Sequence, residues 1–306
     1  MAAPGARLVV LSGPTASGKT DAALALARRH PLEIVNADSM QVYRGMDIGT
    51  AKPSLAERQE VPHHLIDVAS PDEGYSAGRF VAEAEEAIRG ILARGRFPLV
   101  AGGTGLYIRA LRRGLDPLPS DAAVRTRLSR RWEAEGGAAL HAELGRIDPR
   151  AAAKIHPADK VRVIRALEIA AVAGRAPSEL RVSWGGAGRY RVLFLALDPG
   201  RDAMYGRIDR RVDGMFRAGF VEEVRGLLAR GYGEELRSMA ALGYRHVVAH
   251  LLRGVPLADA IAAMKRDTRR YAKRQMTWLR REPDARWIPG DFPVESASEM
   301  TGNFLS

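Results

Sequence analysis

The first hundred residues alternate between short apolar runs and longer segments of helical periodicity. Four runs have the length and composition of buried strands, and they lie at residues 8–11, 32–37, 63–68 and 97–101. Residues 77–94 carry apolar side chains at spacings of three and four, as an amphipathic helix does. Strands that alternate with helices are typical of a parallel sheet covered by helices. We therefore predict an α/β fold.

The pattern changes near residue 113. From there to residue 188 no convincing strand occurs, and the apolar spacing predicts helices at residues 121–135, 138–144, 149–155 and 159–173. A strong strand pattern returns at residues 190–197, so the sheet resumes. We therefore predict an all-helical subdomain, residues 113–188, inserted into a core formed by residues 1–112 and 189–290.

The final third is helical by the same criterion, at residues 202–218, 221–230, 241–252 and 257–281. Spacings of four and three mark one face of the last helix, which carries Met264, Thr268, Tyr271, Gln275 and Trp278. Residues 291–306 follow as a polar segment, and we expect them to form a loosely ordered tail.

The first strand leads into GPTASGKT, residues 13–20, and a helical pattern follows. This is a G-x-x-x-x-G-K-[ST] match in the strand, loop and helix context that a phosphate-binding loop needs. Lys19 would reach the terminal phosphates, and the Thr20 hydroxyl would hold Mg²⁺. A glycine turn without function is disfavoured because every part of the pattern agrees. The sequence predicts a P-loop NTPase-like core whose phosphate-binding residues are Gly13, Pro14, Thr15, Ala16, Ser17, Gly18, Lys19 and Thr20.

A P-loop NTPase usually has a second element, an Asp that closes an apolar strand and helps to hold Mg²⁺. Here the strand at residues 97–101 ends in GGTG, without an acid. This argues against a motor or switch NTPase and is compatible with a small-molecule kinase. Asp38 ends the second strand, beside the loop in a doubly wound sheet. It could accept a proton from a nucleophile or cap a turn, and its position alone favours neither role.

The charge balance points to a partner. The 306 residues include 47 Lys and Arg against 36 Asp and Glu, a formal net charge of +11. An excess of this size favours a polyanion, with nucleic acid ahead of an anionic membrane. Residues 265–281 hold eight basic residues and one acid, Asp267, which is too dense for a solvated helix face of mixed charge. Further basic clusters in the predicted subdomain comprise Arg125, Arg127, Arg130, Arg131, Lys160, Arg162 and Arg165.

Cysteine is absent, which excludes disulfides, thiolate zinc sites and a cysteine nucleophile and fits a reducing cytoplasm. The N-terminal residues lack the long apolar stretch of a signal peptide, and no apolar run reaches 18 residues. We expect a cytoplasmic protein without a membrane partner.

Four stretches, in this order and at these separations, resemble the tRNA dimethylallyltransferase (isopentenyl-tRNA transferase) family: GPTASGKT, DSMQVYRGMDIGTAKP, GGTGLY and RYAKRQMTWLRR. The resemblance implies transfer of the dimethylallyl group from dimethylallyl diphosphate to N6 of adenine 37, beside the tRNA anticodon, with release of pyrophosphate. Lys19 and Mg²⁺ on Thr20 would then absorb charge on the leaving diphosphate. Asp38 would hydrogen-bond N6 and take its proton.

The resemblance also implies roles for further residues. Arg207 and Arg211 would contact pyrophosphate, unless they are only solvated helix charges. The candidate catalytic residues are therefore Asp38, Thr15, Arg207 and Arg211. The candidate tRNA contacts are Asp38, Ser39, Met40, Gln41, Thr104, Arg162, Arg165, Gly243, Tyr244, Arg245, Lys273, Arg274, Gln275 and Trp278. Within that set the segment after Asp38 would read the flipped base, and the two aromatics would stack on RNA unless they are ordinary core residues.

Three other functions remain open. An adenylate isopentenyltransferase modifies free adenine nucleotides and would not need the basic helices. A small-molecule kinase would cleave ATP and has little use for an RNA-binding surface. A non-catalytic RNA-binding module would leave the phosphate loop and Asp38 unexplained. We therefore predict a tRNA prenyltransferase that binds the anticodon stem-loop, dimethylallyl diphosphate and Mg²⁺, and that acts as a monomer.

Overall fold

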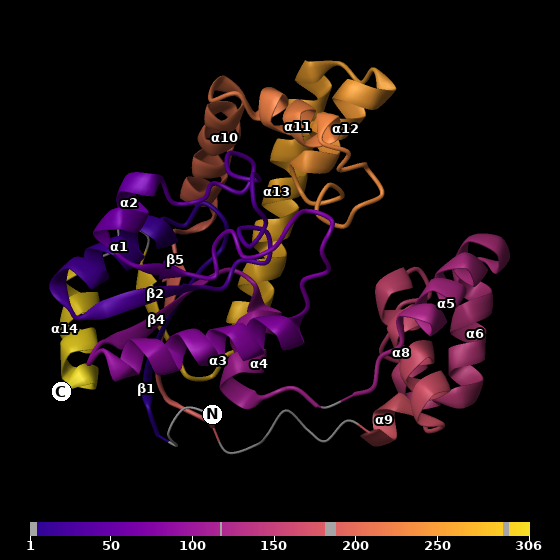
Figure 1. Ribbon diagram of the computed structural model, residues 1–306, viewed down its shortest axis with the longest axis horizontal. Helices are drawn as coiled ribbons and strands as arrows, with labels where there is room; N and C mark the ends of the chain where they lie inside the picture. Colours follow the sequence, from indigo (N-terminus) through magenta and orange to yellow (C-terminus); the bar gives the residue numbers. More distant parts are fainter. Residues whose placement is uncertain (1–4, 117, 181–187, 290–293) are drawn as a thin grey trace. The chain divides into compact units, whose positions relative to one another are not determined.

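The chain forms two compact units, shown in Figure 1. One comprises Met1–Arg112 and Gly188–Ser306, and the other comprises Arg113–Ala187. This computed structural model describes residues 5–116, 118–180, 188–289 and 294–306. The second unit therefore separates two parts of the first along the sequence.

A six-stranded parallel sheet forms the centre of the first unit, in the order β3-β2-β4-β1-β5-β6. Its strands are β1 (Arg7–Ser12), β2 (Leu32–Asn36), β3 (His63–His64), β4 (Phe97–Gly102), β5 (Arg191–Asp198) and β6 (Ala285–Pro289). β1 lies between β4 and β5, and its four apolar residues are fully buried, as a central strand covered on both faces requires. The predicted α/β fold with a parallel sheet is confirmed.

Successive side chains of β1 enter different cores because they point to opposite faces of the sheet. Val9 and Leu11 join the core beneath α1 (Lys19–Arg29) and α14 (Val294–Leu305). Leu8 and Val10 join the larger core on the other face. That core includes residues of α3 (Ala77–Ala93), α4 (Gly105–Arg113), α10 (Arg201–Arg217), α11 (Phe220–Ala229), α12 (Tyr244–Arg253) and α13 (Leu257–Leu279).

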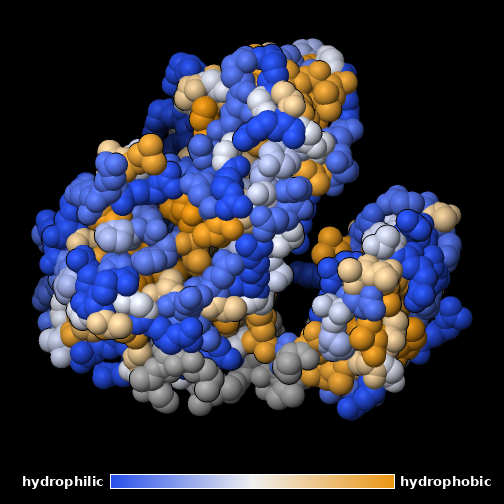
Figure 2. All heavy atoms as spheres, in the orientation of Figure 1, coloured by the Kyte–Doolittle hydropathy of each residue, from blue (hydrophilic) through white to orange (hydrophobic). Residues whose placement is uncertain are grey.

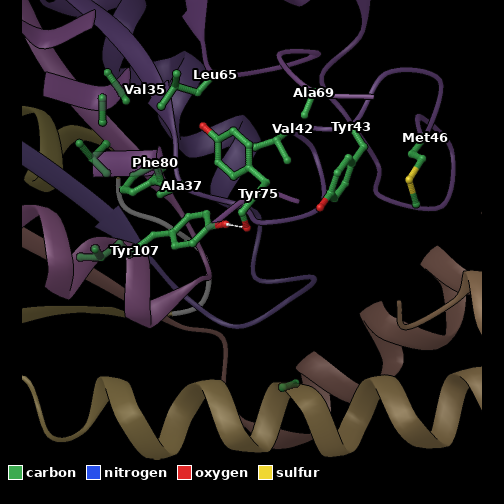
Figure 3. Packing of buried hydrophobic residues seen from close by; sticks show 14 of the residues in the cluster. Val35, Ala37, Val42, Tyr43, Met46, Leu65, Ala69, Tyr75, Phe80 and Tyr107 are labelled. Carbon is green, nitrogen blue, oxygen red and sulfur yellow. Dashed lines mark hydrogen bonds between the residues drawn. The ribbon is translucent and has the colours of Figure 1, made fainter. Parts of the chain in front are cut away.

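The long segment after β2 is anchored in this larger core. Val42 and Tyr43 are buried. The N–H of Arg44 donates a hydrogen bond of 2.8 Å to the carbonyl oxygen of Ala69, whose own N–H donates to the carbonyl oxygen of Val42 at 3.0 Å. Figure 3 shows Val42 beside the ring of Tyr75, whose carbonyl oxygen accepts a hydrogen bond of 3.4 Å from the Tyr107 hydroxyl. The segment that begins at Asp38 is therefore held firmly at the carboxyl end of β2, where open α/β sheets bind ligands.

The C-terminal segment is helical, so the expectation of a loosely ordered tail is wrong for residues 294–306. Ala297 is fully buried in the core beneath α1, and Met300 and Phe304 pack against the same core. Arg7 also donates a hydrogen bond of 2.8 Å to the carbonyl oxygen of Leu305. The spacings of three and four between these apolar residues are those of a helix. In a mostly polar stretch, however, three apolar residues are too few to predict a helix from the sequence. Residues 290–293 lie outside the described ranges.

Two strands differ from the sequence prediction. β3 ends after two residues instead of continuing to residue 68, because Leu65 and Asp67 adopt left-handed φ angles of 63° and 58°. β6 was not expected, since it is only five residues long, ends in a proline and adds to the edge beside β5. The short helix α2 (Leu55–Glu60), also not expected, begins with a capping box between Ser54 and Glu57.

The described residues of the second unit form helices and connecting turns without a strand, and this unit has its own core. Its helices are α5 (Ala122–Glu135), α6 (Gly137–Ile147), α7 (Pro149–Ala152), α8 (Lys160–Ala173) and α9 (Pro177–Leu180). Leu128, Leu140, Leu144 and Val163 are buried between α5, α6 and α8. Across both units, none of the described helices combines the length and the apolar composition that crossing a membrane requires.

Candidate active site

The predicted phosphate loop joins β1 to α1 and has the conformation that its sequence requires. Gly18 precedes the helix with a φ of 88°, which favours glycine, and Ala16 also has a positive φ of 61°. Ala16 pays a steric cost for this conformation, and such strain is often found at ligand-binding loops. The N–H groups at the start of α1 have no earlier helical turn to bond, so they can meet an anion.

A cavity of about 310 Å³ lies in front of this loop. Its walls come from the loop, from the segment after β2, from α10 and from α13. Ten of the predicted site residues line it together: Thr15, Ala16, Ser17, Gly18, Lys19, Thr20, Asp38, Gln41, Arg211 and Gln275. The tertiary structure thus brings four separate parts of the sequence to one site.

Lys19 and Arg211 give the cavity a cationic wall. Burial, and to a smaller extent the nearby Arg211, lower the pKa of Lys19 to about 7, against the opposing effect of Asp38. Burial also lowers the pKa of Arg211, again against the effect of Asp38. The Lys19 ammonium donates a hydrogen bond of 2.7 Å to the carbonyl oxygen of Pro14. A bound diphosphate would relieve the repulsion between the two cations, so the wall is suited to an anion.

We expect the binding of inorganic pyrophosphate to take up protons above pH 7 through Lys19. In the free protein a pKa of about 7 leaves the amine mostly neutral at pH 8, and a bound anion raises that pKa. Well below pH 7 the amine is protonated in both states, so this contribution disappears. Calorimetric titration at pH 8 in buffers of different ionisation enthalpy measures the uptake, and Lys19→Met should reduce it by about one proton. Equal uptake by both proteins would contradict this assignment.

Asp38 is oriented by its neighbours. Its Oδ1 accepts a hydrogen bond of 2.9 Å from the N–H of Met40, while its own N–H donates to Asn36 Oδ1 at 3.1 Å. The Asn36 amide is anchored in turn by a hydrogen bond of 3.0 Å to the carbonyl oxygen of Leu65. Asp38 therefore does stabilise a turn, and it lines the cavity as well, so the two roles considered from the sequence are compatible.

Thr104 lies behind this segment and does not line the cavity. Its hydroxyl oxygen accepts a hydrogen bond of 3.0 Å from the N–H of Ser39, and its own N–H donates to the carbonyl oxygen of Ala37 at 3.2 Å. In this structure Thr104 joins the ends of β2 and β4. It therefore supports the site indirectly, by holding Ser39 in position.

Gln275 corrects the sequence prediction of a direct RNA contact. Its side chain is 4% exposed, Oε1 accepts a hydrogen bond of 2.7 Å from the N–H of Thr15, and Nε2 donates to the carbonyl oxygen of Gly103 at 3.0 Å. Both ends of the amide are thus bonded to the protein, and α13 supports the phosphate loop. Tyr271, one turn earlier on the same face, lines the cavity and was missed. Its spacing of four from Gln275 was the available signal.

The hypothesis that Tyr244 stacks on RNA is wrong, because its ring is fully buried. It packs edge to face on Phe220, with 5.1 Å between the ring centroids. Gly243 is buried too, and Arg245 is paired with Asp267 at 2.6 Å. Trp278 is half-buried and meets Phe194 edge to face at 6.5 Å, which favours the role of a core aromatic.

Most side chains of the predicted basic clusters are exposed, including six of the eight at residues 265–281. On α13, Lys273 and Arg274 are exposed, and Figure 2 shows hydrophilic side chains over much of the visible face of this helix. In the second unit, the Arg162 side chain is 69% exposed. Arg165 differs, because its guanidinium is held by Glu168 at 2.9 Å and by the carbonyl oxygen of Pro119 at 2.9 Å. A phosphate contact by Arg165 would have to compete with these bonds.

The two arginines of α10 have different surroundings. Arg211 lines the cavity, whereas Arg207 does not and lies 3.5 Å from the carbonyl oxygen of Ser17, at the loop itself. The structure also adds Lys52, which the sequence reasoning missed although it lies in the second quoted motif. Its side chain is 2% exposed, and its ammonium binds Asp47 and Asp67, each at 2.6 Å.

Thr20 is the residue that could hold Mg²⁺, since its hydroxyl lies at the start of α1 beside the cavity. Within the described residues, no group of three or more His, Cys, Asp or Glu side chains could hold a metal ion. Mg²⁺ usually keeps several waters and is completed by substrate phosphates. The donors present therefore fit an ion that is bound together with a diphosphate.

Comparisons with known proteins show what the whole chain is similar to. Residues 41–282 match the family described as IPP transferase. A tRNA dimethylallyltransferase from Anaeromyxobacter sp. (strain Fw109-5) is 50% identical, over 97% of this chain and 99% of its own length. The solved tRNA isopentenylpyrophosphate transferase from Bacillus halodurans is 41% identical with a TM-score of 0.71, covering 98% of this chain and 95% of that one.

A second solved structure shows a eukaryotic dimethylallyltransferase acting on tRNA. It is 28% identical to this chain with a TM-score of 0.82, and the match covers 98% of this chain and 80% of that one. The likeness in sequence and in structure extends over nearly the whole chain. The protein therefore belongs to the IPP transferase family.

Proposed function

We propose that this protein transfers the dimethylallyl group of dimethylallyl diphosphate to N6 of adenine 37 in tRNA, giving N6-(dimethylallyl)adenosine and pyrophosphate. One observation carries the proposal: a single cavity joins the phosphate loop with its cations, Lys19 and Arg211, to the oriented carboxylate of Asp38. The names of the relatives and the neighbour that acts on tRNA support the same reaction.

The residues divide the reaction between two sides of the cavity. The loop N–H groups, Lys19 and Arg211 bind the diphosphate, and they stabilise the negative charge that develops as the bond from C1 to oxygen breaks. Asp38 accepts a hydrogen bond from the adenine amino group and takes its proton as the bond from N6 to C1 forms. Mg²⁺ bound at Thr20 would supply further charge neutralisation on the diphosphate.

Exposed cations outside the cavity would hold the tRNA backbone. Lys273, Arg274 and Arg162 are suited to this role because their side chains reach solvent. Gln41 lines the same cavity as Asp38 and would contact the flipped base. We further propose that the protein works in the cytoplasm as a monomer. A cysteine-free chain fits a reducing compartment.

Mass spectrometry of nuclease digests tests the proposal directly. Unmodified tRNA is incubated with the protein, Mg²⁺ and dimethylallyl diphosphate, beside a reaction with ATP in place of the prenyl donor. We expect a gain of one dimethylallyl unit on the adenosine 3′ of the anticodon, and a much slower gain when EDTA removes Mg²⁺. No gain on tRNA, with modification of free AMP or formation of ADP instead, would overturn the proposed function.

A further inference from the structure

Glu223 is bound by a segment of the chain far from it in sequence. It lies in the first turn of α11, and its carboxylate accepts hydrogen bonds from the segment that follows Asp38. The N–H of Asp47 donates to Oε2 at 2.9 Å, that of Ile48 donates to Oε2 at 2.6 Å, and that of Gly49 donates to Oε1 at 3.1 Å. Three successive N–H groups directed at one anion form a nest, a strong backbone arrangement for binding negative charge.

The contact is closely packed as well as hydrogen-bonded. A fourth donor, the hydroxyl of Tyr244 on α12, lies 2.6 Å from Oε1. A Cβ at Gly49 would lie 2.2 Å from the ring of Phe220 and 2.6 Å from that of Tyr244, so no larger residue fits there. Burial and the Glu223 charge both raise the pKa of Tyr244, which keeps its hydroxyl a donor. One carboxylate therefore joins α11, α12 and the turn at residues 47–49.

This turn leads directly to the cavity. The carbonyl oxygens of Thr50 and Ala51 accept hydrogen bonds of 3.2 and 3.1 Å from the Gln41 amide. The Thr50 carbonyl oxygen also lies 3.4 Å from the Arg211 guanidinium. Gln41 and Arg211 both line the cavity. The two carbonyl groups therefore orient one side chain for the base and another for the diphosphate, and their own positions depend on the adjacent turn.

We propose that Glu223 is a positioning residue for prenyl transfer, which acts through residues 47–51 on Gln41 and Arg211. This inference rests on the proposed function. Glu223 does not line the cavity, so it can affect the reaction only indirectly, by fixing the position of the turn at residues 47–49. The position requires a carboxylate, because only its two oxygens together can accept hydrogen bonds from all four donors.

The test variant is Glu223→Gln. Its carboxamide keeps one acceptor oxygen and turns an NH₂ group toward N–H donors, so part of the nest loses its partner. We expect kcat/KM for both substrates to fall about 10- to 100-fold per folded molecule, with the folded fraction taken from thermal unfolding. The matched control is Glu222→Gln, next in sequence, whose side chain is 70% exposed and pairs only with Arg225 among the described residues. The kcat/KM values of Glu222→Gln should stay within about twofold of those of the wild type.

A double-mutant cycle separates positioning from a purely structural role. If Glu223 acts through Arg211, the loss caused by Glu223→Gln should be several-fold smaller in an Arg211→Lys background, because the orientation is already lost. A structural role would give the same fold loss in both backgrounds, and this result would overturn the proposal. Should Glu223→Gln fail to fold, Tyr244→Phe removes one donor with little change in packing. We expect Tyr244→Phe to lower kcat/KM by about threefold or more, and a kcat/KM within twofold of wild type would overturn the proposal.

The outcomes keep this inference distinct from the proposed function. A wild-type protein that does not prenylate tRNA overturns the proposed function and this inference with it. An active wild type with Glu223→Gln no slower than Glu222→Gln overturns only the inference.

Discussion

Replacing Asp38 with Asn is expected to lower kcat for dimethylallyl transfer by about 10³-fold and to leave tRNA affinity within about threefold of wild type. The amide cannot take the N6 proton as the new bond forms. Its oxygen can still accept the hydrogen bond that Met40 donates to Asp38 Oδ1 at 2.9 Å, so the turn keeps its geometry. Loss of catalysis with binding retained is the signature of a general base.

Single-turnover kinetics with saturating enzyme would measure this loss, and filter binding would measure tRNA affinity. Asp72→Asn is a suitable control, because Asp72 is an exposed acid on the same unit and does not line the cavity. If Asp38→Asn prenylates tRNA within tenfold of wild type, Asp38 is only a turn residue, and the base must be sought among the other groups of the cavity.

Replacing Gln275 with Glu is expected to weaken the binding of dimethylallyl diphosphate by about 2–3 kcal/mol, roughly 30- to 150-fold. The change is nearly isosteric, but it removes the donor to the Gly103 carbonyl oxygen, 3.0 Å away, and leaves two oxygens facing each other. It also puts a negative charge within hydrogen-bond distance of Thr15, in the loop that would hold the diphosphate. Both effects act on the prenyl donor and neither acts on the RNA surface.

Arg274, next to Gln275 in the sequence, provides a control with the opposite expected effect on the two affinities. Arg274 is exposed on the same helix, and Arg274→Gln should weaken tRNA binding with little effect on the prenyl donor. Fluorescence titrations with a labelled anticodon stem-loop, and calorimetry with inorganic pyrophosphate, would measure the two affinities separately. If Gln275→Glu instead lowered tRNA affinity alone, the direct RNA contact expected from the sequence would be restored.

Local patterns were sufficient wherever a function depends on residues close together in the chain. The phosphate loop is one strand, one turn and one helix, so its sequence predicts its geometry and its preference for anions. The alternation of apolar runs with helical segments predicted the α/β fold for the same reason. The four motifs identified the family because they preserve order and spacing, which are properties of the sequence itself.

The sequence failed where a residue's partner lies far along the chain. Gln275 was a candidate RNA contact because it lies in the basic fourth motif, and Tyr244 was one because the family resemblance implied it. Yet 260 residues separate Gln275 from Thr15, and 21 residues separate Tyr244 from Glu223. Helical periodicity assigns a side chain to a face of its helix, but it does not say what that face meets. The three apolar residues of α14 are a further case, since their partner is the distant helix α1.

The sequence alone thus determined the fold class, the phosphate loop, the family and the likeness to enzymes that act on tRNA. The tertiary structure decided which of the candidate residues meet in one cavity and which are bonded to the protein. It also revealed the link from Glu223 through residues 47–51 to Gln41 and Arg211. The physical reason is that backbone preference and amphipathicity act over a few residues, whereas the partner of a buried polar group is fixed only when distant segments pack together.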